Sequence, residues 1–341
     1  MWHGLVRARK ATIKCDYPYV SVIIAARNES HDIENCLDAL LVQDYPQHKF
    51  EIIVVNDQST DCTREQLDKF SKNERILILQ NPGQENFKSS KKAALALGIS
   101  KSKGNILLFT DADCKPPPSW ITVMLSFFDA STGLVAGFSP QTTNNTMLAP
   151  LLQIDAAAAA LVSAASIGLG RGITCTGRNL AYRKQAYMDV GGFAETPNSL
   201  SGDDDFMLQA ISHFRRWKVR YAFEIDAVVP AQGPNSLKAF LRQKQRHISA
   251  SKYYPLLAKI LFASYHFLNL FLWLTLLLAC IRFYFFFAFA AKMCVDYFLL
   301  KSFLTRFAKK INFKAFLMWE LLFLYYNVII GPIALIKKIE W

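Results

Sequence analysis

The chain has 341 residues, which is enough for a globular domain with a full hydrophobic core and for a second structural element. Hydrophobic residues make up 52% and charged residues 19%, and the apolar excess is concentrated after about Tyr253, which predicts a soluble body followed by an apolar tail. A net charge of +12 is compatible with binding to nucleic acid, to anionic lipid or to a phosphorylated substrate. Because the chain has no RNP, zinc-finger or helix-turn-helix signature, nucleic acid is not expected as a partner.

The cysteines and the N-terminus indicate a body in the cytosol. Seven cysteines are scattered without CxxC spacing, which favours reduced thiols over disulfides or a zinc site. Residues 1–19 carry basic side chains but no apolar stretch behind them, so no signal peptide is predicted.

Short apolar runs alternate with helical patterns from Val20 to Phe138. The predicted strands are VSVIIAA, FEIIVVN, RILIL, NILLFT and GLVAGF, and the predicted helices are HDIENCLDALLVQ, CTREQLDKFSK and SSKKAALALGISKSK. This alternation predicts an α/β fold with a mostly parallel sheet and helices on both faces. In such sheets ligands bind at the carboxyl ends of the strands.

Polar residues follow three of these strands. They are Arg27–Ser30 after the first, Asn56–Asp61 after the second and Thr110–Asp113 after the fourth. We therefore expect these segments to form one polar rim that carries the functional site.

Asp111 and Asp113 end an apolar run and precede three prolines. On an extended chain, residues two apart point to one face, so both carboxylates are expected to hold one Mg²⁺ or Mn²⁺ ion. A solvated turn is the alternative interpretation. The segment Pro116–Pro118 is expected to stay extended and to leave the sheet without covering the site.

The second strand ends in Asn56 and Asp57, where a carboxylate could accept a hydrogen bond from a nucleobase or a ribose hydroxyl. The alternative is an ordinary strand end, with Ser59, Thr60 or Asp61 capping the next helix.

Three consecutive carboxylates, Asp203 to Asp205, precede a predicted helix. Crowded like charges raise one another's pKa and a helix N-terminus lowers it, so one of them can be poised as a general base. A plain N-terminal acid cluster is the alternative.

Two basic segments could bind phosphate. Gln243 and Arg246 stand three apart and share a helix face, and arginine pairs with phosphate oxygens; an interfacial helix on anionic lipid is the other interpretation. Lys88, Lys91 or Lys92 could contact an anionic donor, although KSSKK lacks phosphate-loop glycines and suits a solvated helix start.

The C-terminal part contains three hydrophobic segments. These are Leu256–Cys280, Phe283–Leu300, which includes Lys292 and Asp296, and Phe313–Ile336. The basic stretch between the second and the third is predicted to lie in the cytosol, and an interfacial position of the third is left open. An Ala-rich helix, QIDAAAAALVSAASI, is expected to pack or to form an interface.

Taken together, these motifs resemble inverting family 2 glycosyltransferases with the GT-A fold, of the membrane-associated bacterial type. VSVIIAARNES is similar to the family's opening strand, EIIVVNDQSTD to its nucleoside-binding strand, and LLFTDADCKPPPSWI to its metal-binding Asp-x-Asp. TGRNLAYRKQAYMDVGGF, SGDDDF and QKQRH resemble its acceptor-side segment, its acidic base motif and its Gln-x-x-Arg-Trp motif. The resemblance covers about Val20 to His247.

The resemblance implies a nucleotide-diphosphate-sugar donor, with Mg²⁺ or Mn²⁺, and direct displacement at the anomeric carbon. The implied roles are metal binding by Asp111 and Asp113, nucleoside binding by Asp57, Glu29 and Lys91, closure over the diphosphate by Gln243 and Arg246, base catalysis by Asp204, and support of the acceptor by Asp203.

The expected organisation follows from the same resemblance. Residues 20–250 are expected to be the catalytic domain, with a donor half at about 20–140 and an acceptor half at about 141–250, and residues 251–341 a membrane region with two or three helices. The expected location is the plasma membrane, multi-pass, with the catalytic domain on the cytoplasmic face. His247 replaces the family's usual Trp and the tail has few helices, which favours single-sugar transfer over a processive polymerase.

The expected partners are a nucleotide sugar, a glycan or lipid-linked acceptor, and membrane lipids, in glycan or glycolipid synthesis. Two alternatives stay open. One is transfer to a polyprenyl phosphate, as in dolichol-phosphate mannose synthases, and the other is a non-catalytic membrane scaffold.

Overall fold

The structure is a computed structural model that describes residues 17–83, 87, 89–197 and 199–336. The expectations for residues 1–16, for Lys88 and for the last five residues lie outside this range. The chain forms two compact units, of which the first contains residues up to Thr142 together with Ala159–Gly233. The second contains Thr143–Ala158 and Pro234–Trp341.

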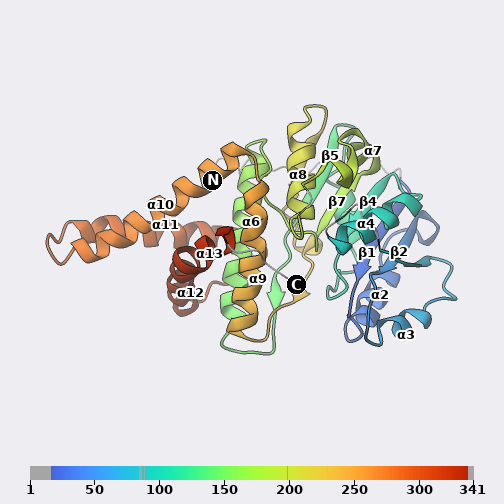
Figure 1. Ribbon diagram of the computed structural model, residues 1–341, viewed down its shortest axis with the longest axis horizontal. Helices are drawn as coiled ribbons and strands as arrows, with labels where there is room; N and C mark the ends of the chain where they lie inside the picture. Colours follow the sequence, from blue (N-terminus) through green and yellow to red (C-terminus); the bar gives the residue numbers. More distant parts are fainter. Residues whose placement is uncertain (1–16, 84–86, 88, 198, 337–341) are drawn as a thin grey trace. The chain divides into compact units, whose positions relative to one another are not determined.

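The first unit is built on a seven-stranded sheet in the order β3-β2-β1-β4-β7-β5-β8 (Figure 1). Its strands are β1 (Val20–Ala26), β2 (Phe50–Asn56), β3 (Ile76–Gln80), β4 (Ile106–Phe109), β5 (Thr132–Gly137), β7 (Leu180–Arg183) and β8 (Lys218–Ala222). A separate parallel pair is formed by β6 (Gln141–Thr142) and β9 (Ala231–Gln232).

Helices cover both faces of this sheet. They are α2 (Ile33–Leu41), α3 (Thr63–Asp68), α4 (Ser90–Lys101), α5 (Trp120–Leu125), α7 (Lys184–Asp189) and α8 (Asp203–His213). Val22 and Ile24 of β1 share one buried cluster with residues of α2, α3 and α5. On the opposite face, a Cβ on Gly98 of α4 would meet Ile23. Because both faces are covered, β1 is almost entirely buried, which is why it reads as an unbroken apolar run.

The predicted α/β class is confirmed, but the sheet is more mixed than expected. Strands β3, β2, β1 and β4 are parallel to one another. β7 runs antiparallel to both of its neighbours, and β5 and β8 are parallel. The sequence analysis predicted neither β7 nor β8, because each is short and contains charged residues.

The second unit contains a run of helices. They are α9 (Leu237–Ala250), α10 (Leu256–Leu278), α11 (Phe285–Thr305), α12 (Phe313–Tyr325), the π-helical turn η5 (Tyr326–Ile330) and α13 (Gly331–Ile336). Short 3-10 turns elsewhere are η1 (Gln47–Lys49), η2 (Gly192–Glu195), η3 (Ile225–Ala227) and η4 (Ser251–Tyr253). The Ala-rich helix α6 (Ala149–Gly168) begins in this unit and ends in the first.

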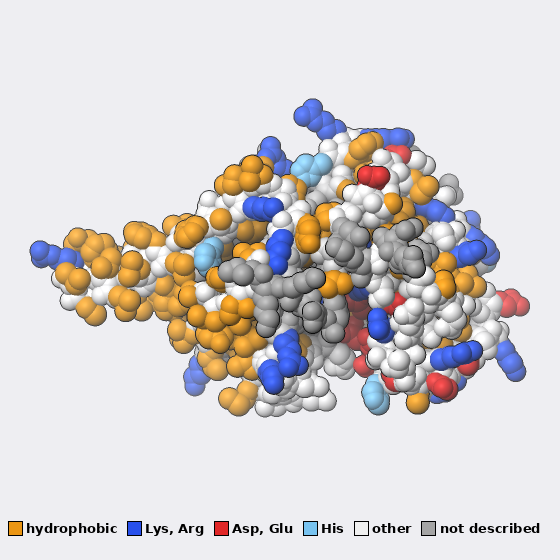
Figure 2. Space-filling view, in the orientation of Figure 1, with side chains coloured by type: hydrophobic (Ala, Val, Ile, Leu, Met, Phe, Trp, Pro, Cys, Tyr) orange, Lys and Arg blue, Asp and Glu red, His pale blue; other side chains and the backbone are white. Residues whose placement is uncertain are grey.

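Three helical segments among the described residues are long and apolar enough to cross a membrane: Ala149–Gly168, Leu256–Leu278 and Phe313–Leu335. The second and third were predicted as possible spans, whereas the Ala-rich helix was expected to pack or to form an interface near the membrane. α11 is not among them, and it holds the ion pair between Lys292 and Asp296, 3.0 Å apart. Figure 2 shows that hydrophobic side chains dominate the surface of the α10–α11 hairpin, where Phe267 is 69% exposed.

Candidate active site

The carboxyl ends of β2, β1 and β4 lie side by side. Ala26 at the end of β1 pairs with Asn56 at the end of β2, and Ile23 pairs with Phe109 at the end of β4. The three polar segments that follow these strands therefore leave the sheet at one edge, as predicted.

The loops after β1 and β2 are joined by hydrogen bonds. The Asn28 N–H donates to Ser59 Oγ at 3.0 Å, and the Thr60 N–H donates to Asn28 Oδ1 at 2.8 Å. Asn28 and Gln58 both have φ of 57°, in the left-handed region that a non-glycine residue enters at a cost. The shared hydrogen bonds hold both loops in this conformation.

Asp61 links the same two loops at the start of α3. Its carboxylate accepts from the Ser30 N–H at 3.2 Å and from the Thr63 N–H at 3.0 Å. Burial alone raises the pKa of Asp61, but hydrogen bonds from Thr63 and Ser30 outweigh it and lower the pKa to about 2. Asp61 is therefore a structural anion of the loops. It accepts from the Thr63 N–H, but the N-cap residue of α3 is Cys62, so the expected cap from Ser59, Thr60 or Asp61 is wrong.

Asp57 is buried at the tip of β2. Its Oδ1 accepts a hydrogen bond from Asn81 Nδ2 at 2.6 Å. Asn81 follows β3, so the third strand also contributes to the rim. Sequence reasoning missed Asn81, although a polar residue after a strand was the signal already used for Asn56 and Asp57.

Asp111 and Asp113 lie in a turn, so the expected extended geometry is wrong. β4 ends at Phe109, and the Cys114 N–H donates to the Asp111 carbonyl at 3.1 Å. The two carboxylates are still close enough to interact, because burial and then Asp111 raise the pKa of Asp113 to about 6. The turn forms where the pairing of β4 with its neighbours stops.

The carboxyl group of Glu29 interacts with the charges of Asp111 and Asp113. Burial, then Asp113 and Asp111, raise the pKa of Glu29 to about 8. Its expected contact with a nucleoside stays a prediction. Arg178, which precedes β7, is near enough to lower the pKa of Asp113. The segment TGRNLAYRKQAYMDVGGF contains Arg178, but the sequence analysis predicted no role for this arginine.

Two adjacent lysines at the start of α4 differ in environment. Lys91 Nζ lies 2.6 Å from Asp111 Oδ1. Burial opposes its charge, but Asp111 and Asp203 outweigh this and raise the pKa of Lys91. Lys92 is buried and donates to the Pro197 carbonyl at 2.7 Å, so a solvated helix start is wrong for Lys92.

Asp203, Asp204 and Asp205 form the first turn of α8. The Asp204 carboxylate accepts from the Gly177 N–H at 2.7 Å and from the Asp205 N–H at 2.9 Å. Burial is the main cause of a raised pKa of Asp204, followed by repulsion from Asp205 and Asp203. Asp204 is thus fixed in position by two backbone donors.

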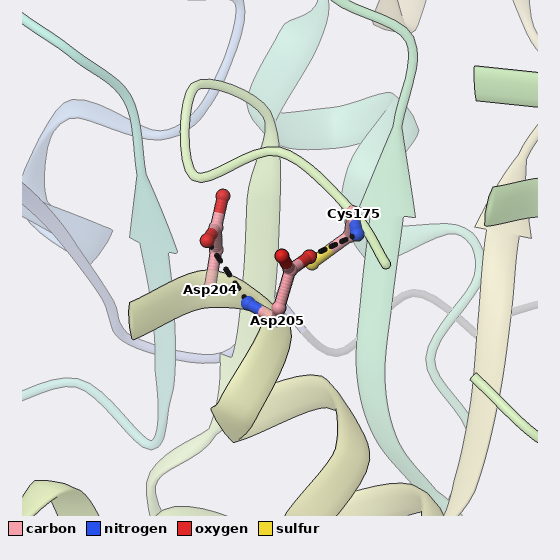
Figure 3. A group of neighbouring side chains, drawn as sticks. All are labelled: Cys175, Asp204 and Asp205. Carbon is pink, nitrogen blue, oxygen red and sulfur yellow. Dashed lines mark hydrogen bonds between the residues drawn. The ribbon is translucent and has the colours of Figure 1, made fainter. Parts of the chain in front are cut away.

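The Asp205 carboxylate accepts a hydrogen bond from a different backbone amide than Asp204 does. Figure 3 shows the Asp205 carboxylate turned toward Cys175, whose N–H donates to it at 2.9 Å. Ligand atoms of Cys175, Asp204 and Asp205 lie within 4.8 Å of one another. Backbone amides already donate hydrogen bonds to the carboxylates of Asp204 and Asp205, and a thiol is a poor ligand for Mg²⁺ or Mn²⁺. We therefore interpret the three residues as part of the turn that starts α8 and not as a metal site.

One cavity in the first unit brings the predicted residues together. Lys91 of α4, Asp111 after β4, Gly177 before β7, and Asp203 and Asp204 of α8 line it. Apolar and aromatic side chains such as those of Phe109 and Tyr182 complete the lining. An acid of the Asp-x-Asp segment, a lysine and the proposed base therefore face the same space.

The donor set around Asp111 and Asp113 fits a divalent cation. Carboxylate oxygens are the hard ligands that Mg²⁺ and Mn²⁺ prefer. Burial is the main cause of the raised pKa values of Asp113 and Glu29, and repulsion among the carboxylates adds to it. A bound cation would relieve this repulsion.

Pro117 and Pro118 lead the chain away from this cavity. The Pro117 carbonyl accepts from Gln43 Nε2 at 2.7 Å, and the Pro118 carbonyl accepts from the Asp44 N–H at 2.8 Å. Both partners follow α2. The prolines therefore lie against the loop after α2, consistent with the expectation that they leave the site uncovered.

Gln243 and Arg246 lie on α9 in the second unit. Three residues apart, they share one helix face, as predicted. Their expected closure over a diphosphate stays a prediction.

Comparison with known protein families supports the resemblance to family 2 glycosyltransferases. The profile of glycosyl transferase family 2 matches residues 21–191, and that of glycosyl transferase family group 2 matches residues 154–330. Glycosyltransferase AglE of Haloferax volcanii is 41% identical over 107 residues, which are 30% of this chain and 33% of that protein. Probable glycosyltransferase YdaM of Bacillus subtilis is 26% identical over 245 residues, 70% of this chain and 56% of that protein. These matches span from a third to just over half of the relatives' own lengths.

A solved structure extends the similarity over the whole chain. The mannosyltransferase PcManGT from Pyrobaculum calidifontis, solved with GDP-Man and Mn²⁺, superposes with a TM-score of 0.64 and 18% identity. The superposition covers 99% of this chain and 94% of that one. At this identity the comparison shows a shared fold.

Proposed function

The chain belongs to glycosyl transferase family 2, and we propose that it transfers a sugar from a nucleotide-diphosphate donor to an acceptor hydroxyl with inversion. The observation that carries the proposal is the cavity shared by Lys91 of α4, Asp111 after β4 and Asp204 of α8. The complex of PcManGT with a nucleotide sugar and Mn²⁺ supports the same donor class.

Asp57 and Asn81 would bind the nucleoside at the tips of β2 and β3. Asp57 is buried and its carboxylate is oriented by Asn81, so its second oxygen is positioned to accept from a ribose hydroxyl or a base N–H. Lys91 would approach the diphosphate, with Gln243 and Arg246 of α9 closing over it. The charges of Asp113 and Asp111 act on Glu29, and its contact with the nucleoside stays a prediction.

Asp111 and Asp113 would hold the divalent cation. When bound, Mg²⁺ or Mn²⁺ would neutralise charge on the departing nucleotide diphosphate. Lys91 would add positive charge beside the same group, because its Nζ is already 2.6 Å from Asp111 Oδ1.

Asp204 would remove the proton from the acceptor hydroxyl, and Asp203 would help to hold that acceptor. Two backbone N–H groups fix the Asp204 carboxylate in place, and burial makes it more basic. A single displacement with one base inverts the anomeric centre.

The three apolar helical segments support a membrane location, for which we propose the cytoplasmic face of the plasma membrane.

The proposal is tested with the purified full-length chain and a panel of GDP-, UDP- and dTDP-sugars in the presence of Mn²⁺. We expect nucleotide diphosphate release that depends on an acceptor, with product of inverted configuration. Asp204→Asn should lower turnover roughly 10²–10⁴-fold while donor binding is kept. Asp111→Asn with Asp113→Asn should abolish the Mn²⁺ dependence of donor binding.

Two results would contradict the proposal. Full turnover by the Asp204→Asn variant would remove the hydroxyl-base mechanism and favour an acceptor that is already anionic, such as a polyprenyl phosphate. Failure of every nucleotide to bind would favour a non-catalytic membrane protein.

A further inference from the structure

A second cavity lies beside α9, within the second unit. Its volume is about 370 Å³, and it is lined by Leu237, Lys238, Leu241, Arg242, Gln245 and Ile330. The first five lie on α9 and the last belongs to the π-helical turn η5. α9 packs against η5 and α13, so the cavity occupies the junction of these elements.

The lining divides into an ionic part and an apolar part. Lys238 and Arg242 are four residues apart and exposed, and they stand on the same side of α9. Within the described part of the chain, neither forms an ion pair with a carboxylate. Leu237, Leu241 and Ile330 supply the apolar surface next to them.

The sequence of α9 makes this cavity attractive to anions. The helix contains no Asp or Glu, so no carboxylate on α9 neutralises its four Lys and Arg side chains. Of these cations, Lys244 is already paired with Asp155 of α6 in a buried contact. Lys238 and Arg242 are therefore available for an anionic ligand.

The apolar part of the cavity continues along an apolar helical segment. Ile330 lies within Phe313–Leu335, and α9 packs against the C-terminal part of that segment, which suits a position of this part at the membrane surface. On the same segment, Ile329 and Ile333 are 43% and 42% exposed. An occupant with a phosphate at Lys238 and Arg242 could thus extend a hydrocarbon chain along this segment.

The centre of the cavity lies on a different side of α9 from Gln243 and Arg246. At about 100° per residue, the centre of the cavity-lining face of α9 lies about 140° from the centre of the Gln243–Arg246 face. The buried face between them is held by Phe240 and by the Lys244–Asp155 ion pair. Arg242 and Arg246 are four residues apart and are therefore neighbours on α9, so the two faces adjoin at Arg242, whereas Lys238 and Leu241 lie farther from Gln243 and Arg246.

We propose that this cavity binds an anionic phospholipid of the bilayer, with its phosphate between Lys238 and Arg242 and its acyl chain against Leu241 and Ile330. The site is independent of the proposed transfer reaction. It would retain α9 at the membrane surface through a specific lipid contact in addition to the general attraction between a basic helix and an anionic membrane.

The test measures binding of spin-labelled phosphatidylglycerol to the full-length chain in phosphatidylcholine vesicles. Lys238→Gln with Arg242→Gln should lower the relative association constant roughly 30-fold, from about fivefold for each cation near the surface. Lys310→Gln with Lys314→Gln is the matched control, since it removes two exposed cations from the same unit. The control should keep nearly all of the binding.

Equal losses in the two double variants would overturn the proposal, because they would show a diffuse electrostatic effect. A second arm separates lipid from free phosphate. Leu241→Gln should weaken phosphatidylglycerol binding, and inorganic phosphate should fail to displace the labelled lipid. Displacement by inorganic phosphate with no effect of Leu241→Gln would identify a phosphate-ion site and contradict a lipid site. Thermal unfolding of each variant checks that the fold is kept.

Discussion

Lys91 Nζ and Asp111 Oδ1 are 2.6 Å apart, so the start of α4 and the residues after β4, the next strand in the chain, meet in one ion pair. The two side chains are 40% and 30% exposed, which leaves both accessible to a ligand. A cation at Asp111 and a diphosphate beside it would have to share this contact with Lys91.

Lys91→Gln should therefore have opposite effects on two ligands. Removing the ammonium should tighten Mn²⁺ binding to the ligand-free protein about fivefold, because the lysine no longer competes for Asp111. The same change should weaken nucleotide diphosphate binding by about tenfold. Calorimetric titrations measure both, and Lys103→Gln, at an exposed lysine after α4, is the control. Unchanged affinity for both ligands would show that Lys91 has no part in the site.

Asn81→Ala should raise the KM for the donor more than it lowers kcat. Asn81 donates at 2.6 Å to Asp57, and loss of a hydrogen bond to a charged group leaves the Asp57 carboxylate unoriented. We expect a rise in KM of roughly tenfold. Asn73→Ala is a suitable control, because Asn73 Oδ1 accepts only a local bond from the Arg75 N–H. An equal fall in kcat with constant KM would place Asn81 outside donor binding.

Asn179→Leu should destabilise the first unit strongly. Asn179 is fully buried, donates to the Phe138 and Ala227 carbonyls at 2.9 and 2.7 Å, and accepts from Trp120 Nε1 at 2.9 Å. Replacing it removes the partner of the buried Trp120 indole N–H and one hydrogen bond from each of the two carbonyls, at a cost of about 3–5 kcal/mol in the free energy of unfolding.

Urea unfolding of the full chain in detergent, followed by tryptophan fluorescence, measures this loss. The control is Asn144→Ala at an exposed position, for which we expect a change within about 0.5 kcal/mol. Similar stabilities of the two variants would show that Asn179 does not join β7 to its surroundings.

Asp129 should make the stability of the fold depend on pH in acid. Burial alone raises its pKa, but hydrogen bonds from Ser131 and Thr132, with Arg220, outweigh it and lower the pKa to about 2. The unfolded value is about 3.9, so the contribution is complete above about pH 4 and is lost as the pH falls toward about 2. Asp129→Asn should remove this part of the pH dependence, as measured by unfolding between these limits. An unchanged slope in the variant would contradict the assignment.

Much of the first half of the fold could be predicted from the sequence. The bounds of β1 and β2 agree with the runs VSVIIAA and FEIIVVN, because strands buried on both faces are continuously apolar. β7 and β8 gave no such signal, since LAYR and KVRYA mix charged and apolar residues over a few positions. Their place in the sheet depends on pairing with β4 and β5, which are distant in the chain.

The sequence by itself determined the parallel strands, the apolar helices and the types of residue at the strand ends, because periodicity and composition are local properties of the chain. The tertiary structure decided which of those residues meet. It placed Asp111 and Asp113 in a turn, buried Lys92 but left Lys91 beside Asp111, and brought Asn81 to Asp57. These contacts depend on strand order and helix packing between residues far apart in sequence, and no local pattern records them.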